Sequence, residues 1–404
     1  MKRSILTLSL LSALAVTSCQ RDFDEVTPQR EPQASETGSI TTPARAFLST
    51  QGAEAGVLYF RIQRSAKSSL RAFDANGASM SSLPSQMAQS LRSIGTESLE
   101  PLFPIDPRFE ERMRREGLDL WYVVRFNKQQ DLQAAMQTLS TTPEIEYTEP
   151  VYEIARPTGK AVAVDAPRRS DAPAAPFDDP MLGDQWHYNN TGRFPRSVAG
   201  ADIGLFKAWE KETGKPNVIV AITDGGIDIT HPDLKDNLFV NQKELNGQEG
   251  VDDDGNGFID DINGFNFIHN NGKIYPDDES HGTHVAGTVA ARNNNGIGVA
   301  GIAGGDGTEG SGARLMSCQI FGGEREGGNS ANAIVYSANN GAVISQNSWG
   351  YIYKANITAI PQSQKAAIDY FIKYAGCDKD GNQLPNSPMK GGVVIFAAGN
   401  DGLD

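Results

Sequence analysis

Positive charge, cysteine and long apolar runs are all scarce in this sequence, and each scarcity narrows the classes of protein to consider. Thirty-six lysines and arginines stand against 50 aspartates and glutamates, and the net charge of −14 argues against a nucleic-acid partner and favours bound cations. Beyond the N-terminus, no apolar run reaches the roughly 18 residues that a membrane-spanning helix needs. Only three cysteines occur, and the strand-like run LMSCQIF around Cys318 favours a buried free thiol over a disulfide with Cys377.

Glycine, by contrast, is abundant, with 42 among 404 residues, and 39% of the chain is apolar. This composition is typical of a loop-rich globular protein rather than a disordered or fibrous one. The length suits two folded units, at least one of them large enough for a sizeable core.

The N-terminus, MKRSILTLSLLSALAVTSCQ, has the features of an export signal: a basic start, a short apolar stretch and small residues before Cys19. The tetrapeptide VTSC resembles a bacterial lipobox, which implies that Cys19 becomes the lipidated first residue of the mature chain. We therefore expect an exported lipoprotein, anchored in a membrane of the cell envelope or at the cell surface. The alternative is an ordinary cleaved signal with an incidental cysteine and an extracellular product.

Four further segments follow residues 1–19. Residues 20–45 are polar, contain proline and lack periodicity, which predicts a flexible tether. Residues 46–155 alternate strand-like runs such as VLYFRIQ with helix-like ones such as KQQDLQAAMQTLST, which predicts a small α+β domain. Residues 156–176 are rich in Pro, Ala and charge and predict an exposed, cleavable linker. Residues 177–404 alternate β-rich runs with helices, which predicts an α/β domain with a parallel sheet and ligands at the carboxyl ends of its strands.

Two motifs of this last segment bring together residues suited to acid–base chemistry. The run VIVAIT delivers Asp224 to a strand's carboxyl end, followed by two glycines that allow a tight turn. The run DDESHGTHVAGTVAAR predicts a helix with Ser280 as its N-cap and His281 in its first turn. A histidine near a helix N-terminus is held neutral by the helix dipole, which suits a general base.

The motifs ITDGG, HGTHVAG, NSWG and AAGN occur in that order and resemble those of the subtilisin-like serine proteases. The resemblance covers residues 177–404 and implies a serine endopeptidase that hydrolyses proteins with an Asp-His-Ser triad. Asp224 would then orient His281, which would take the proton from the serine. Asn400 would donate its side-chain amide to the oxyanion, as acyl transfer requires.

The resemblance also implies where an extended peptide binds. Ser348, Trp349 and Gly350 resemble the Ser-x-Gly segment that lines the primary specificity pocket, and Gly327 and Gly328 resemble the edge strand that pairs with the substrate backbone. The alternative for these glycines is loop flexibility.

The acidic run DDDGNGFIDD predicts a calcium-binding loop. Its alternating oxygens follow the first half of an EF-hand loop, and the expected ligands are Asp252, Asp254, Asn256, Asp260 and the carbonyl of Phe258. The twelfth position is Asn263 rather than Glu, so we expect a structural calcium site without a full EF-hand. The alternative is a solvated acidic turn.

The first folded unit ends in PEIEYTEPVYEI, which resembles the end of subtilase propeptides and implies a zymogen whose own propeptide assists folding and inhibits the enzyme. The family's Gly-Thr-Ser-Met-Ala-x-Pro motif, which carries the nucleophile, does not occur in the sequence. We expect that the chain is truncated before its serine and is inactive as supplied.

Two other functions stay open. One is a natural non-catalytic relative that binds or inhibits through the cleft. The other is a metal-dependent hydrolase using His281 and His284, whose spacing of three departs from the zincin spacing of four.

Overall fold

The C-terminal part of the molecule is built on a five-stranded sheet in which all neighbouring strands are parallel, in the order β11-β9-β6-β8-β7. Its strands are β6 (Ile219–Gly225), β7 (Gly264–Asn266), β8 (Arg314–Phe321), β9 (Ile344–Asn347) and β11 (Val393–Phe396). The helices of this part are α5 (Leu205–Trp209), α6 (Gln242–Leu245), α7 (His281–Ala290), α8 (Ser330–Asn339) and α9 (Gln362–Tyr374). The expected parallel α/β sheet is confirmed.

The computed structural model describes residues 49–68, 83–156, 175–322, 329–352 and 359–400, which all lie within one unit, Phe47–Asp404. Cys19 and the expected tether lie outside these ranges. Within them, no helix combines the length and the apolar character needed to cross a membrane.

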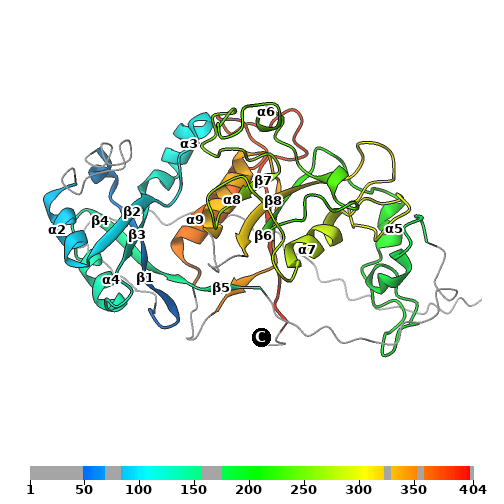
Figure 1. The fold of residues 1–404 in the computed structure, drawn as a ribbon, viewed down its shortest axis with the longest axis horizontal. Helices are drawn as coiled ribbons and strands as arrows, with labels where there is room; N and C mark the ends of the chain where they lie inside the picture. The colour runs from blue at the N-terminus through cyan, green and yellow to red at the C-terminus, as the bar shows by residue number, and fades with distance from the viewer. Residues whose placement is uncertain (1–48, 69–82, 157–174, 323–328, 353–358, 401–404) are drawn as a thin grey trace, which may run out of the picture. The chain divides into compact units, whose positions relative to one another are not determined.

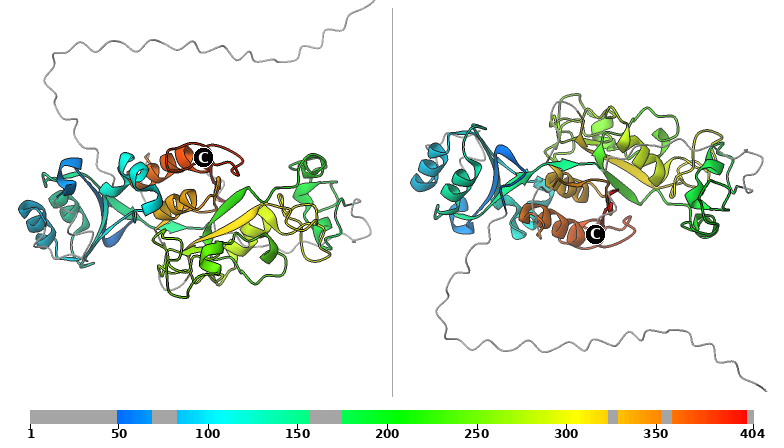
Figure 2. Two further views of the ribbon diagram at one scale, coloured as in Figure 1. Left: turned by 90° about the horizontal axis from the view of Figure 1, so that it is seen from above. Right: turned by 90° about the horizontal axis from the view of Figure 1, so that it is seen from below.

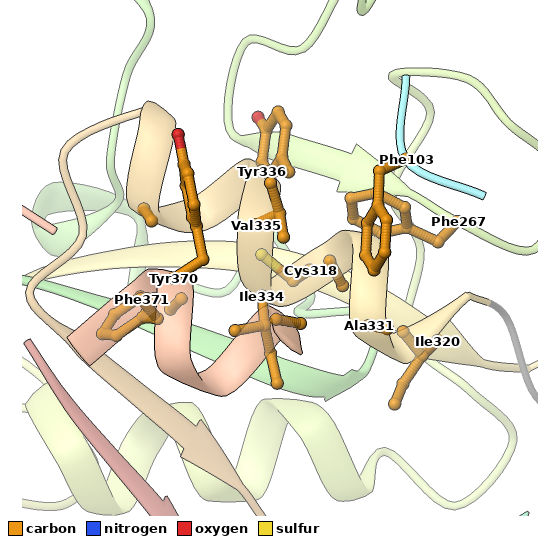
Figure 3. Packing of buried hydrophobic residues seen from close by; sticks show 14 of the residues in the cluster. Phe103, Phe267, Cys318, Ile320, Ala331, Ile334, Val335, Tyr336, Tyr370 and Phe371 are labelled. Carbon is orange, nitrogen blue, oxygen red and sulfur yellow. The ribbon is translucent and has the colours of Figure 1, made fainter. Parts of the chain in front are cut away.

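Helices cover both faces of the parallel sheet. Val220 and Ile222 of β6 share a core with α7, whereas Ala221 between them belongs to the core that contains α8 and α9, because successive strand residues point to opposite faces. Figure 1 shows α7 and the α8–α9 pair as separate layers about β6 and β8. Figure 3 shows the packing of the second core, in which α8 lies over Cys318 of β8 and beside α9. Cys318 is buried and free, as expected, and so is Cys377.

The N-terminal part forms a four-stranded antiparallel sheet in the order β2-β3-β1-β4. Its strands are β1 (Ala53–Ile62), β2 (Thr96–Pro101), β3 (Trp121–Phe126) and β4 (Ile145–Tyr152), and its helices are α2 (Ser85–Ser93), α3 (Glu110–Arg115) and α4 (Leu132–Ser140). Leu58 and Phe60 of β1 pack with α2 and α4, while Val57 joins the core of α8 and α9. The expected α+β unit is confirmed, with β2 and α3 as elements that the sequence did not predict.

A two-stranded sheet links the two parts. After β4, the short strand β5 (Ile154–Ala155) pairs antiparallel with β10 (Gly350–Tyr351). Figure 2 shows this connection from two sides. The final strand of the N-terminal part therefore lies along a segment of the C-terminal part.

The strand β11 forms one edge of the parallel sheet. Its side chains Val393, Ile395 and Phe396 are apolar and exposed. The described residues thus leave this edge of the sheet uncovered.

Candidate active site

The residues Asp224 and His281 lie together at the carboxyl end of β6. Asp224 is the penultimate residue of β6 and His281 the first of α7, and the Nδ1 of His281 is 2.7 Å from the Oδ1 of Asp224. The Asp224 side chain is fully buried, and the His281 side chain is 27% exposed. A buried carboxylate therefore fixes the orientation of a partly exposed imidazole.

The approach of α7 to β6 explains the small residues around this pair. A Cβ on Gly225 would lie 2.0 Å from the Oδ2 of Asp277, and a Cβ on Gly282 would lie 2.1 Å from the carbonyl oxygen of Gly225. A Cβ on Gly226 would lie 1.8 Å from the carbonyl oxygen of Tyr275, so the two glycines after Asp224 permit close packing rather than the tight turn that the sequence suggested.

The start of α7 is capped differently from the expectation. Ser280 occupies the N-cap position, with a left-handed φ of 54°, but its side chain makes no capping bond. Instead, the Oδ1 of Asp277 accepts from the backbone N–H of His281 at 3.0 Å. Asp277 is buried and positions the backbone that carries the imidazole.

Electrostatics favour a basic imidazole. The hydrogen bond to Asp224 is the main cause that raises the pKa of His281, and burial opposes it. The Oδ2 of Asp224, the Oγ1 of Thr223 and the Oδ1 of Asn347 are buried and have no hydrogen-bond partner among the described residues. Thr223 and Asn347 are neighbours across β6 and β9, so unsatisfied polar atoms gather at this edge of the sheet.

The structure places Asn400 at the same edge. It follows β11, whose end is tied to β9 by the N–H of Ala397 donating to the carbonyl of Asn347 at 3.0 Å. Asn400 is exposed and lies two strands from β6 in the sheet order.

The segment from Ser348 to Gly350 binds a strand. Gly350 pairs with Ala155, and the N–H of Ile352 donates to the carbonyl of Glu153 at 2.9 Å. Trp349 is buried, with its ring centroid 5.2 Å from that of Phe396, and Ser348 accepts from the Nε2 of Gln346 at 3.1 Å. Gly327 and Gly328 lie outside the described residues.

The acidic loop gathers a different set of oxygens from the predicted one. Glu244 of α6, Asp252 and Asp254 each offer a carboxylate oxygen within 4.8 Å of the other two. Glu244 was not predicted, because it precedes the loop and the EF-hand spacing gives no signal for it. It also accepts from the N–H groups of Asp253, Asp254 and Asp260.

The other predicted ligands stay predictions. The Oδ1 of Asn256 accepts from the N–H of Phe258 at 2.6 Å, and Asp260 accepts from the N–H of Gly250 at 3.0 Å. Three close carboxylates fit a cation, because without one their charges repel. One counter-charge is Arg108 of the N-terminal part, whose Nη1 is 2.9 Å from the Oδ2 of Asp254.

Two charged residues of the N-terminal part hold the ends of α9, and the sequence did not single out either. The carboxylate of Glu149 accepts from the N–H groups of Gln362 and Ser363 at 2.7 and 3.1 Å, where Pro361 provides no cap. Burial raises the pKa of Glu149 to about 7, against the effect of these hydrogen bonds. At the other end, Arg112 donates to main-chain carbonyls that follow the helix.

Comparisons with known proteins agree with this arrangement. Residues 65–192 match the N-terminal of Subtilase family model, and residues 215–404 match the Subtilase family model. A subtilisin-like protease 1 from Plasmodium berghei is 35% identical over 171 residues, which is 41% of this chain and 27% of the relative. An extracellular basic protease from Dichelobacter nodosus is 26% identical over 307 residues, which is 71% of this chain and 42% of the relative.

A solved structure has a similar fold. Fervidolysin from Fervidobacterium pennivorans is a keratinolytic enzyme related to subtilisin. Its structure has a TM-score of 0.50 at 20% sequence identity, and the match covers 87% of this chain and 41% of the fervidolysin chain. The chain thus spans only 26% to 48% of the length of the curated relatives it matches. The two matching models, together with the Asp224–His281 pair at the carboxyl edge of a parallel sheet, show that the chain belongs to the subtilase family.

Proposed function

We propose that this protein is a serine endopeptidase that hydrolyses peptide bonds in protein substrates and is made as a zymogen. The observation that carries the proposal is the 2.7 Å contact between the Nδ1 of His281 and the Oδ1 of Asp224 at the carboxyl end of β6. The proposal requires a nucleophilic serine within reach of the Nε2 of His281.

Each residue has one role in the proposed reaction. The Nδ1–H of His281 donates a hydrogen bond to Asp224, which leaves Nε2 to take the serine proton as the oxygen attacks the carbonyl carbon. Asn400 donates its side-chain amide to the oxyanion. His281 then returns the proton to the leaving amine, and water hydrolyses the acyl-enzyme by the same route.

The pairing of β5 with β10 supports the zymogen. A substrate would form the same main-chain hydrogen bonds with Gly350 that the propeptide forms, so the two compete for one site. Cleavage between 156 and 176 would free the site once the N-terminal part dissociates.

Calcium and a lipid anchor complete the proposal. Glu244, Asp252 and Asp254 would hold a structural calcium ion that fixes the loop between Asp224 and His281. Cys19 would carry the lipid that anchors the exported protein in a membrane.

The test is proteolysis of casein by the full-length gene product after self-processing. We expect hydrolysis that His281→Ala reduces by about a millionfold, as in other triad knock-outs. A folded, processed protein that binds casein fragments without hydrolysing them would favour the non-catalytic binding or inhibitory alternative. Activity abolished by a chelator and restored by zinc, but not by calcium, would favour the metal-dependent hydrolase.

A further inference from the structure

The chain beyond β5 leads a charged side chain to the catalytic pair. Ala155 pairs with Gly350, so Arg156 is the residue that follows the last paired position. The positive charge of Arg156 lowers the pKa of His281. Its effect is smaller than that of the hydrogen bond from the imidazole to Asp224, which raises that pKa. A substrate bound in the same register would place its own side chain there.

Two carboxylates and one ring receive the guanidinium of Arg156. Its Nη1 forms an ion pair with the Oδ2 of Asp277, and its Nη2 is 3.9 Å from the Oε2 of Glu279. Its Cζ is 5.6 Å from the ring centroid of Phe321. The Arg156 side chain is 19% exposed, so most of the guanidinium is withdrawn from water.

Asp277 is held in place by contacts unrelated to Arg156. Its Oδ1 accepts from the N–H of His281 at 3.0 Å, and its carbonyl accepts from the N–H of Ser280 at 2.9 Å. The side chain packs so closely against Gly225 that a Cβ there would collide with it. Its Oδ2 is therefore fixed in direction, and the side chain is only 2% exposed.

A fixed, buried carboxylate discriminates between side chains. When Arg156 leaves, the carboxylate of Asp277 stays buried and loses the cation that neutralised it. An apolar or acidic side chain cannot replace that cation. Arginine suits the site better than lysine, because its planar guanidinium can pair with Asp277 and stack on Phe321 together. Glu279 is 74% exposed and adds a weaker, solvent-screened attraction.

We propose that Asp277 and Glu279 form an acidic subsite that selects an arginine or lysine in the substrate, at the position following the residue paired with Gly350. This inference rests on the proposed endopeptidase function and adds a substrate class to it. Arg156 occupies the subsite in the zymogen as a substrate side chain would.

The test uses the self-processed full-length enzyme and fluorogenic peptides that copy residues 150–160. Position 156 is arginine, lysine, norleucine or glutamate, and mass spectrometry checks that all peptides are cleaved at one bond. We expect kcat/KM for the arginine peptide to exceed that for the norleucine peptide at least tenfold, because only the arginine peptide can form a desolvated ion pair with Asp277. Lysine should fall between them, and glutamate should be the poorest.

Variants assign the preference to its residues. Asp277→Asn keeps an acceptor for the N–H of His281 and should lower the arginine-to-norleucine ratio about tenfold. Glu279→Lys, at an exposed position that leaves the α7 cap intact, should lower the ratio a few-fold and improve the glutamate peptide. Asp278→Asn removes the same charge from an exposed neighbour and should leave the ratio unchanged.

Two patterns would overturn the inference, and they differ. Equal kcat/KM for the arginine and norleucine peptides, in an enzyme that cleaves both, would refute the acidic subsite and leave the endopeptidase intact. No hydrolysis of casein or of any peptide by the folded, processed protein would refute the proposed function and, with it, the subsite.

Discussion

Replacing Arg112 should release the N-terminal domain from α8 and α9. Arg112 is fully buried. It donates to the main-chain carbonyls of Cys377 and Asp378 at 3.0 and 2.8 Å. It also donates to the Oδ1 of Asn339 at 2.8 Å and to the hydroxyl of Tyr370 at 2.7 Å. These partners lie at the C-terminal ends of α8 and α9, where helix dipoles favour a cation.

The cost of Arg112→Ala follows from its partners. Asn339 and Tyr370 keep a hydrogen bond to each other at 2.8 Å, and the carbonyl of Asp378 still accepts from the N–H of Gly381 at 3.1 Å, so the carbonyl of Cys377 suffers most. A buried acceptor left unpaired costs about 1–3 kcal/mol. One such acceptor, together with the lost charged hydrogen bond to Asp378 at about 1.5–3 kcal/mol, gives about 2.5–6 kcal/mol. Arg112→Lys should lose about half, because an ammonium reaches fewer acceptors.

Hydrogen exchange measures this loss directly. The full-length protein with His281→Ala, which prevents self-cleavage, keeps the domain attached while it docks and undocks. If docking protects α8 and α9, a loss of 3 kcal/mol should speed exchange of their amides about 150-fold. The control is Arg92→Ala, at an exposed position in the last turn of α2. Exchange on α8 and α9 that changes less than about threefold in Arg112→Ala would refute the reasoning.

Three further predictions concern pH, the catalytic pair and calcium. The pKa of Glu149 is about 7 in the docked domain, whereas its ordinary value is 4.5. The stabilisation that protonated Glu149 gives to docking is therefore fully present below pH 4.5 and is lost as the pH rises through 7. Glu149→Gln should therefore flatten the pH dependence of zymogen activation between pH 4.5 and 7.5, and an unchanged slope would contradict this assignment. Asp224→Asn removes the main cause of the raised pKa of His281, so NMR titration should find that pKa lowered and kcat should fall about 10⁴-fold; an unaltered pKa would show that Asp224 does not act on the imidazole. Calcium at 100 times its dissociation constant should stabilise the protein by about 2.7 kcal/mol in thermal unfolding, and Asp252→Asn should abolish the difference between calcium and chelator; equal melting temperatures with and without calcium in the unmutated protein would exclude the site.

The sequence predicted that Asp224 and His281 lie together, because the signals for this pair are local. A β-rich run ends at Asp224 and a helix begins at His281, and a parallel sheet brings such ends to one edge. The strands β8, β9 and β11 were predictable for the same reason, as short runs rich in β-favouring residues. By contrast, β2 reads TESLEP, which lacks β-branched alternation, and its pairing with β3 comes from tertiary context.

The contacts of the N-terminal domain were not predictable, because their partners lie far away in the chain. Glu149 contacts residues more than 210 positions later, and Arg112 contacts residues more than 220 positions later. No spacing rule links a cap to a helix at that separation. The role of Asp277 was not predictable for a different reason. Ser280 is of a residue type that usually caps helices and occupies the N-cap position, but its backbone is left-handed and its side chain makes no capping bond.

Labelling with a fluorophosphonate probe tests the central claim most directly. The probe reacts with a serine activated by a neighbouring base, so it reports the catalytic constellation without a choice of substrate. After the N-terminal part of the full-length protein is removed, by self-processing or, for the variants, by an added protease, we predict one modified serine, located by peptide mapping. His281→Ala and Asp224→Asn should strongly reduce this labelling. A folded, processed protein that takes up no label, or that labels equally well without His281, would contradict the account.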